Sequence, residues 1–106
     1  MMTDFRISVM HSEINFHLKA TLNLIRCAFP DGIDVESYFP LLALLEEEMS
    51  DRSLAETIAY CTKKDYSEVL NDIYAVKSTS IPSDEAINIV KSRLLACGYD
   101  EWLNED

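Results

Sequence analysis

Residues 38–50, which read YFPLLALLEEEMS, predict the centre of the fold. Pro40 is favoured in the first turn of a helix, and the leucines that follow it leave no polar face over two turns. A helix that is apolar on all sides is buried, so we expect a central helix at about 40–49. The glutamates at 46–48 would then stand at its C-terminal end, where the helix already carries negative partial charge.

The segment before this block predicts a helix from a cap at Ser12 to about Phe29. Its apolar residues recur at three- and four-residue spacing, and the Pro-Asp-Gly sequence at 30–32 ends it. Asp34 can cap a very short turn over 35–38 before the central helix begins.

Three further helices are expected after the block. Either Ser50 or Ser53 caps the first, and Asp65 caps the second, which runs to about Val76 before a loop at 77–80. The last helix opens with a first turn at 82–85 and stops at Gly98. Its buried face is marked by Ile87, Val90, Leu94 and Cys97, and residues 99–103 are expected to fold back because Trp102 and Leu103 are apolar.

Composition agrees with an all-α fold. The chain has 106 residues, 48% of them hydrophobic, and only two glycines and three prolines to make turns. We therefore predict one domain spanning 1–106, a compact bundle of five to six helices, with 1–11 as a possible loose arm and 104–106 as a frayed tail.

The net charge of −10 indicates the kind of partner. Such a chain repels nucleic acid and anionic membranes and attracts basic proteins. The charge is concentrated in the window 30–60, where eight acids accompany one base, Arg52, and the formal charge is −7. We predict a partner-binding surface from these acids and one aromatic residue: Asp31, Asp34, Glu36, Tyr38, Glu46, Glu47, Glu48, Asp51 and Glu56.

Two interpretations of the three glutamates stay open. Acids in the last turn of a helix oppose its dipole at roughly 0.3–1 kcal/mol each. They either keep a leucine-rich helix end solvated or form a surface that sacrifices stability for attraction to a basic partner. Tyr38 is as well explained by packing in the core as by a role as an interface anchor.

The cysteines Cys27, Cys61 and Cys97 are odd in number and far apart, which favours reduced, buried thiols in a cytoplasmic protein. No signal peptide is visible at the N-terminus, and no apolar run reaches the length of about 18 residues that a membrane span needs.

No motif indicates an enzyme. His11 and His17 are six residues apart and would point in different directions from one helix, so they do not form a metal site. No phosphate-binding loop, dinucleotide fingerprint or zinc spacing occurs, and no cysteine lies in a nucleophile signature. We expect neither a cofactor, a metal nor a catalytic residue.

The segments FPDGIDVESYFPLLALL, DIYAV and IPSDEAINIVKSRLLACGYDEW, in this order, resemble a family of small all-helical domains found mainly in actinobacteria. That family is described only as a domain of unknown function, so the resemblance implies a helical bundle over about 25–103 and no activity. The chain departs from it in two places. The family tends to have basic residues after the leucine block, where this chain has the glutamates, and its final Gly-Trp-Pro is replaced by Gly98-Tyr99-Asp100.

Two functional hypotheses follow. Small acidic helical proteins without catalytic motifs are similar in kind to bacterial immunity proteins, which neutralise nuclease toxins, including those of contact-dependent growth inhibition. The alternative is a housekeeping helical adaptor or a carrier of a small apolar ligand held between helices.

Overall fold

The computed structural model describes residues 16–104, and within them the chain forms six helices and no strand. The helices are α2 (Phe16–Ala28), α3 (Val35–Leu45), α4 (Asp51–Thr62), α5 (Tyr66–Ser78), α6 (Asp84–Leu95) and α7 (Tyr99–Leu103). The expected all-α bundle is confirmed. The predicted cap at Ser12, the arm at 1–11, and the side chains of His11 and His17 lie outside the described part.

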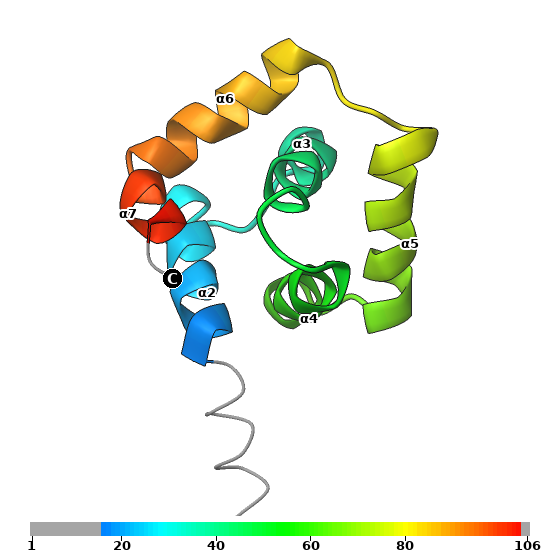
Figure 1. Ribbon diagram of the computed structural model, residues 1–106, viewed down its shortest axis with the longest axis horizontal. Coiled ribbons are helices and arrows are strands. Elements are labelled where there is room, and N and C mark those ends of the chain that lie inside the picture. The colour runs from blue at the N-terminus through cyan, green and yellow to red at the C-terminus, as the bar shows by residue number, and fades with distance from the viewer. Residues whose placement is uncertain (1–15, 105–106) are drawn as a thin grey trace, which may run out of the picture.

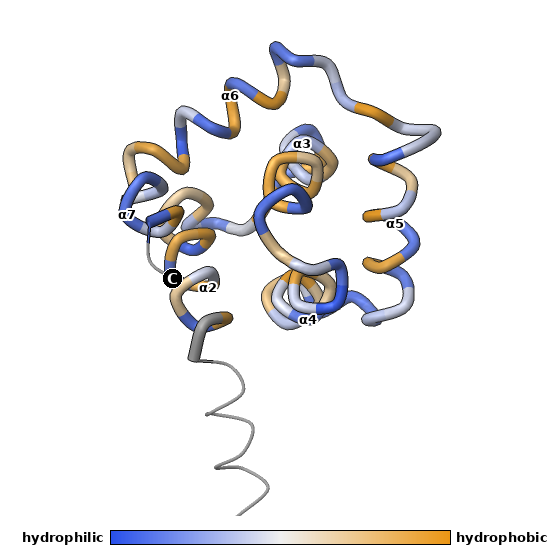
Figure 2. The backbone as a smooth tube through the Cα atoms, in the orientation of Figure 1, coloured by the Kyte–Doolittle hydropathy of each residue, from blue (hydrophilic) through white to orange (hydrophobic). Residues whose placement is uncertain are grey.

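Helix α3 is the central helix, as predicted. It runs almost along the line of sight in Figure 1, with α6 above it, α5 and α2 on either side and α4 below. Leu41, Leu42 and Leu45 are fully buried in the core. The hydropathy colouring of Figure 2 shows the same arrangement, with apolar α3 segments in the middle and polar turns at the periphery.

The predicted bounds of α3, about 40–49, were wrong at both ends, since the helix ends at Leu45 and the glutamates at 46–48 form the turn that follows it. The turn expected over 35–38 and the helix expected from Pro40 are one continuous helix, and Pro40 lies inside it. Proline has no N–H, so the carbonyl of Glu36 loses its intrahelical partner, but Glu36 is exposed near the helix end, where water can replace that bond. The ring of Pro40 is itself buried, so it contributes to the core.

The other helix ends follow local chemistry. Of the two caps considered for α4, the side chain of Ser50 accepts a hydrogen bond from the backbone N–H of Ser53. Ser83 caps α6 in the same way through the N–H of Ala86, so Pro82 precedes that helix instead of opening it. Asp65 occupies the predicted cap position of α5, but its side chain makes no capping hydrogen bond. The helix continues two residues beyond Val76.

The C-terminal segment folds back onto the bundle, as expected. Gly98 has a φ of 96°, a left-handed conformation that glycine adopts easily, and this turn reverses the chain between α6 and α7. Trp102 is then buried against α2, where its indole N–H donates to the hydroxyl of Thr21 over 3.0 Å. Leu103, expected to be buried as well, is 39% exposed.

Candidate partner-binding surface

The fold divides the predicted acidic residues between the two ends of α3. Asp31, Asp34 and Glu36 lie at the N-terminal end, whereas Glu46, Glu47, Glu48 and Asp51 lie around the turn into α4. A helix of 11 residues separates these groups by roughly 16 Å. Glu56 is exposed on α4. The window 30–60 therefore supplies two separate groups of acids.

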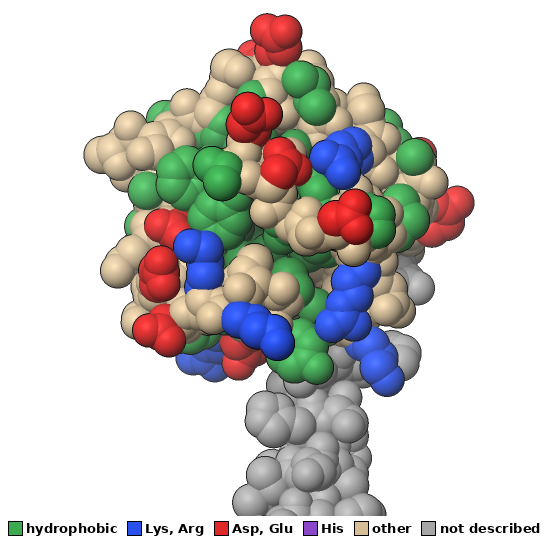
Figure 3. Space-filling model, turned by 180° about the vertical axis from the view of Figure 1, so that it is seen from behind, with side chains coloured by type: hydrophobic (Ala, Val, Ile, Leu, Met, Phe, Trp, Pro, Cys, Tyr) green, Lys and Arg blue, Asp and Glu red, His purple; other side chains and the backbone are tan. Residues whose placement is uncertain are grey.

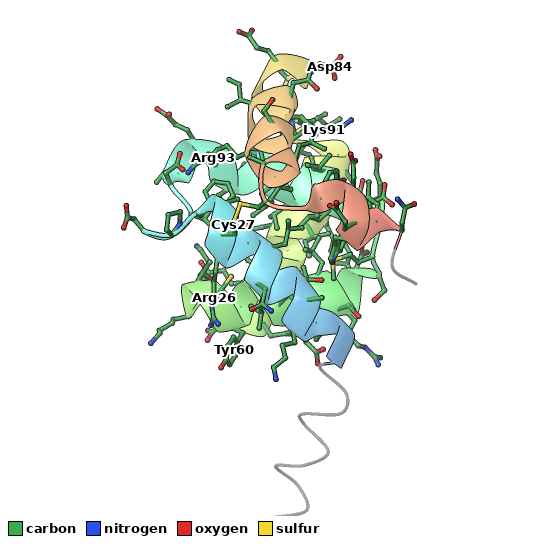
Figure 4. The ribbon with its side chains drawn as sticks, turned by 90° about the vertical axis from the view of Figure 1, so that its left-hand side faces the viewer. Arg26, Cys27, Tyr60, Asp84, Lys91 and Arg93 are labelled. Atoms are coloured by element: carbon green, nitrogen blue, oxygen red, sulfur yellow. A yellow bond between two sulfur atoms is a disulfide. The ribbon has the colours of Figure 1, made fainter. Side chains whose placement is uncertain are left out.

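At the N-terminal end, Asp34 is engaged within the protein. Its carboxylate lies 3.5 Å from Nη1 of Arg93 and accepts a hydrogen bond from the Ser37 hydroxyl at 3.0 Å. Figure 4 shows Arg93 reaching from α6 toward the turn between α2 and α3. Here Asp34 helps to attach this turn to α6.

At the C-terminal end, Lys77 of α5 neutralises part of the acidic group. Its Nζ lies 2.9 Å from Asp51 and 3.7 Å from Glu46. The hydrogen bond to Asp51 is the main reason why the pKa of Lys77 is raised. These contacts link the end of α3, the start of α4 and the end of α5, so Glu46 and Asp51 have a structural use.

Glu47 and Glu48 remain exposed, and the fold brings a further acid near them. The side chain of Tyr99 is buried, and burial raises its pKa to about 12, with smaller contributions from the carboxylates of Glu48, Glu47 and Asp100. All three carboxylates therefore lie within electrostatic range of one hydroxyl. None of the three takes part in an ion pair among the described residues. We call Glu47, Glu48 and Asp100 the Tyr99 acidic cluster.

Sequence reasoning missed Asp100 because it lies more than fifty positions beyond the other two acids. The sequence did predict that residues 99–103 fold back. It did not predict which part of the bundle they would contact. The reversal at Gly98 packs α7 against α2 and α6, and the carboxylates of Glu47, Glu48 and Asp100 each contribute to the raised pKa of Tyr99.

Tyr38 is held in a contact between α3 and α5. Its hydroxyl donates a 2.7 Å hydrogen bond to the carboxylate of Asp72, and Nζ of Lys64 lies 5.1 Å from the centre of its ring. Burial and the Asp72 carboxylate together raise the pKa of Tyr38. Tyr38 is partly buried and packs against the core. This geometry gives it a structural role whatever else it contacts.

The face of the molecule seen in Figure 3 has no large area of a single charge. Acidic and basic side chains are interspersed over it, and a hydrophobic area lies among them. Such mixing cancels the field at a distance, so this face offers little steering toward a basic partner.

The prediction of three reduced thiols was wrong for two of them. Cys27, in the last turn of α2, is joined by a disulfide to Cys97 in the turn between α6 and α7, with the two Cα atoms 5.9 Å apart. The yellow bond in Figure 4 marks this link. The error arose because the partners are 70 residues apart and only the fold brings them together. Cys61 is a free thiol, as expected, and burial raises its pKa.

A groove of about 450 Å³ lies beside this disulfide, between α2 and α7. It is open to solvent and is lined by Ala20, Asn23, Leu24, Cys97, Gly98, Glu101 and Trp102. Over residues 16–104, no set of His, Cys, Asp and Glu side chains is arranged to hold a metal ion. Within the same residues, no helix is long and apolar enough to cross a membrane.

The model of a family described as "Protein of unknown function (DUF3349)" matches residues 16–102. The chain belongs to this family. The match includes the Tyr99 acidic cluster and both cysteines of the disulfide, but it assigns no activity to them. No curated protein and no solved structure matches the chain.

Proposed function

We propose that this chain is a non-enzymatic protein-binding module that meets a basic partner with the C-terminal end of α3 and the start of α7. The observation that carries the proposal is the Tyr99 acidic cluster, in which Glu47 and Glu48 are exposed without an ion-pair partner among the described residues. Like charges that lie close together cost stability, and a cationic partner would relieve that cost on binding.

The finer proposal is an immunity protein. A nuclease toxin must present Lys and Arg to the phosphates of its substrate, and fixed carboxylates can occupy the same basic cleft. The net charge of −10 would accelerate encounter with a cationic toxin. Lys77 fixes the turn that carries Glu47 and Glu48 through its ion pairs with Asp51 and Glu46. The proposal places the protein in the cytoplasm of the cell that it protects.

The direct test uses a toxin. The purified chain is mixed with the product of the gene immediately upstream, which this proposal expects to be a toxin, and cleavage of RNA and DNA is followed. We expect stoichiometric inhibition by this chain. Undiminished cleavage at equal concentrations would reject the immunity function. It would not by itself reject binding of another basic partner, which the next experiment tests.

The surface is tested separately with two charge-matched variants. Glu47→Gln with Glu48→Gln removes two charges from the cluster, and Asp84→Asn with Glu85→Gln removes two from the start of α6. Figure 4 shows Asp84 at the outer end of α6. The first variant should slow association and flatten its salt dependence, whereas the second should change both much less. Equal effects of the two variants would remove the cluster from the interface.

The groove between α2 and α7 favours one alternative, a carrier of a small apolar ligand. Leu24, Ala20 and Trp102 supply an apolar wall, and Asn23 and Glu101 could orient a polar end. The groove is open, whereas carriers bury most of their ligand's surface, so this alternative has less support. Native mass spectrometry of the purified chain would decide it, since a carrier should retain a ligand of defined mass.

A further inference from the structure

Cys27 is the accessible half of the disulfide. It lies in the last turn of α2, its residue is exposed to solvent, and it does not belong to the buried core cluster. Cys97 is half-buried and packs against that cluster from the turn that leads into Gly98. Of the two residues, Cys27 is therefore the one more open to an attacking thiolate from solvent.

The helices that the disulfide joins are also held by other contacts. Trp102 of α7 donates a hydrogen bond to the hydroxyl of Thr21 in α2, which keeps α7 on α2. Arg93 of α6 donates a 2.8 Å hydrogen bond to the carbonyl of Ala28, next to Cys27. None of these contacts uses the cysteine side chains, so we expect them to hold the helices together when the disulfide is broken.

From these observations we propose that Cys27–Cys97 is a reversible thiol–disulfide exchange site that a dithiol reductant opens in the folded protein. Exposed disulfides that can be attacked in the native state are the labile and regulatory ones, whereas buried structural disulfides resist reduction. This inference does not depend on the proposed function.

The exchange proceeds in two balanced steps. A thiolate of the reductant attacks Sγ of Cys27, a mixed disulfide forms, the Cys27–Cys97 bond breaks, and Cys97 leaves as a thiolate that takes up a proton. The second thiolate of the reductant then attacks the reductant's own sulfur in the mixed disulfide and releases Cys27 as a thiol. The protein gains two electrons and two protons, and the dithiol becomes a disulfide.

The groove would change with the redox state. Cys97 and Gly98 form part of its wall, and Trp102 lines it as well. With the disulfide open, the turn at 96–98 is no longer tied to α2, so the wall gains freedom. Trp102 is the chain's single tryptophan, and its fluorescence therefore reports this region specifically.

The first experiment measures how the rate of reduction depends on dithiothreitol concentration. It uses the oxidised full-length chain carrying Cys61→Ala, which leaves only the two cysteines of interest, in buffer without denaturant. We expect about a tenfold faster loss of the disulfide for a tenfold rise in dithiothreitol, because attack on the native state is bimolecular. Trp102 fluorescence should change while the far-ultraviolet helix signal is retained. A rate that does not depend on dithiothreitol, or loss of the helix signal with reduction, would show that the bond opens only on unfolding and would overturn the proposal.

The second experiment locates the attack. The same oxidised protein is exposed briefly to the monothiol 2-mercaptoethanol, quenched with acid and analysed by peptide mass spectrometry. We expect the mixed disulfide on Cys27 and a free thiol on Cys97. The adduct on Cys97, or an adduct only after denaturant is added, would contradict the assignment.

Discussion

The indole N–H of Trp102 donates a hydrogen bond to the hydroxyl of Thr21 across 81 residues, in a site that is closed to water. Thr21 is fully buried and Trp102 is 8% exposed. An indole N–H has no acceptor capacity and must find one acceptor when it is buried. This contact therefore specifies how α7 is seated on α2, and with it the position of Tyr99 and Asp100.

Replacing Thr21 by Val should destabilise the protein by about 1–3 kcal/mol, because the shape is kept while a buried donor loses this acceptor. Thr21→Ser keeps the hydroxyl and removes only a methyl group, so it should cost less, about 1 kcal/mol. Urea unfolding followed by the fluorescence of Trp102 measures both. A Ser variant as unstable as the Val variant would mean that packing of the methyl group, not the hydrogen bond, is what matters here.

Much of the fold could be predicted from the local sequence. The leucine block identified the buried helix because nothing in it could face water. Gly98 marked a chain reversal, and Ser50 was one of two serines proposed as the cap of α4, because each performs a local backbone task. Pro40 misled the prediction of a helix start. Its preference for a first turn is a statistical tendency, and burial of its ring outweighs one lost hydrogen bond near an exposed end.

The candidate site was less accessible to sequence reasoning. Charge counting found the acidic window but could not tell which acids the fold would use internally. Lys77 and Arg93 lie outside that window. Lys77 nevertheless forms ion pairs with Asp51 and Glu46, and Arg93 forms one with Asp34. Asp100 and the Cys27–Cys97 bond depend on long-range contacts that no local pattern specifies.

Arg93 should stabilise the fold more than its neighbour Lys91. Its guanidinium lies 4.2 Å from the centre of the Phe29 ring, donates to the carbonyl of Ala28 and pairs with Asp34. Because these contacts are partly exposed, we expect Arg93→Met to cost about 1–2 kcal/mol. Lys91→Met, on an exposed position of the same helix, removes the same charge and should cost less than about 0.5 kcal/mol.

Arg93→Lys separates charge from shape in this contact. Lysine keeps the charge but cannot both stack on Phe29 and donate through a planar fork, so most of the loss should persist. The free energy of unfolding in urea, compared at equal denaturant slope, measures all three variants. Full stability of the lysine variant would attribute the effect to charge alone.

The disulfide should raise the free energy of unfolding by an amount set by the length of the loop that it closes. For a 70-residue separation, the loss of unfolded-state entropy corresponds to about 4 kcal/mol. The free energy of unfolding of a domain of this size is roughly 5–15 kcal/mol, so the reduced protein should stay folded. Cys27→Ala and Cys97→Ala each break the same link, so each single variant should lose nearly as much as the double variant. Additive losses in urea unfolding would instead indicate two independent packing effects.

Stability should fall at alkaline pH, and Tyr99 should account for part of the fall. Its pKa is 10.0 in the unfolded chain and about 12 in the folded one. Between these values the unfolded state has released the proton that the folded state still holds, so rising pH favours unfolding by up to about 1.4 kcal/mol per pH unit. Below pH 10 this contribution to stability is fully present, and it is lost progressively as the pH rises toward 12.

Tyr38, Cys61 and Lys77 also have raised pKa values and act in the same direction, so the measurement must isolate Tyr99. Tyr99→Phe keeps the buried ring and should reduce the slope of unfolding free energy against pH in this range. Glu47→Gln with Glu48→Gln should lower the pKa of Tyr99, because two of the carboxylates that disfavour the phenolate lose their charge. The chain has five tyrosines, so the Tyr99 titration is taken as the difference in phenol absorbance between each protein and the same protein carrying Tyr99→Phe. The Asp84→Asn, Glu85→Gln variant should leave that titration where it is. If the two variants titrate alike, the carboxylates of Glu47 and Glu48 do not act on Tyr99, and the Tyr99 acidic cluster does not exist as an electrostatic unit.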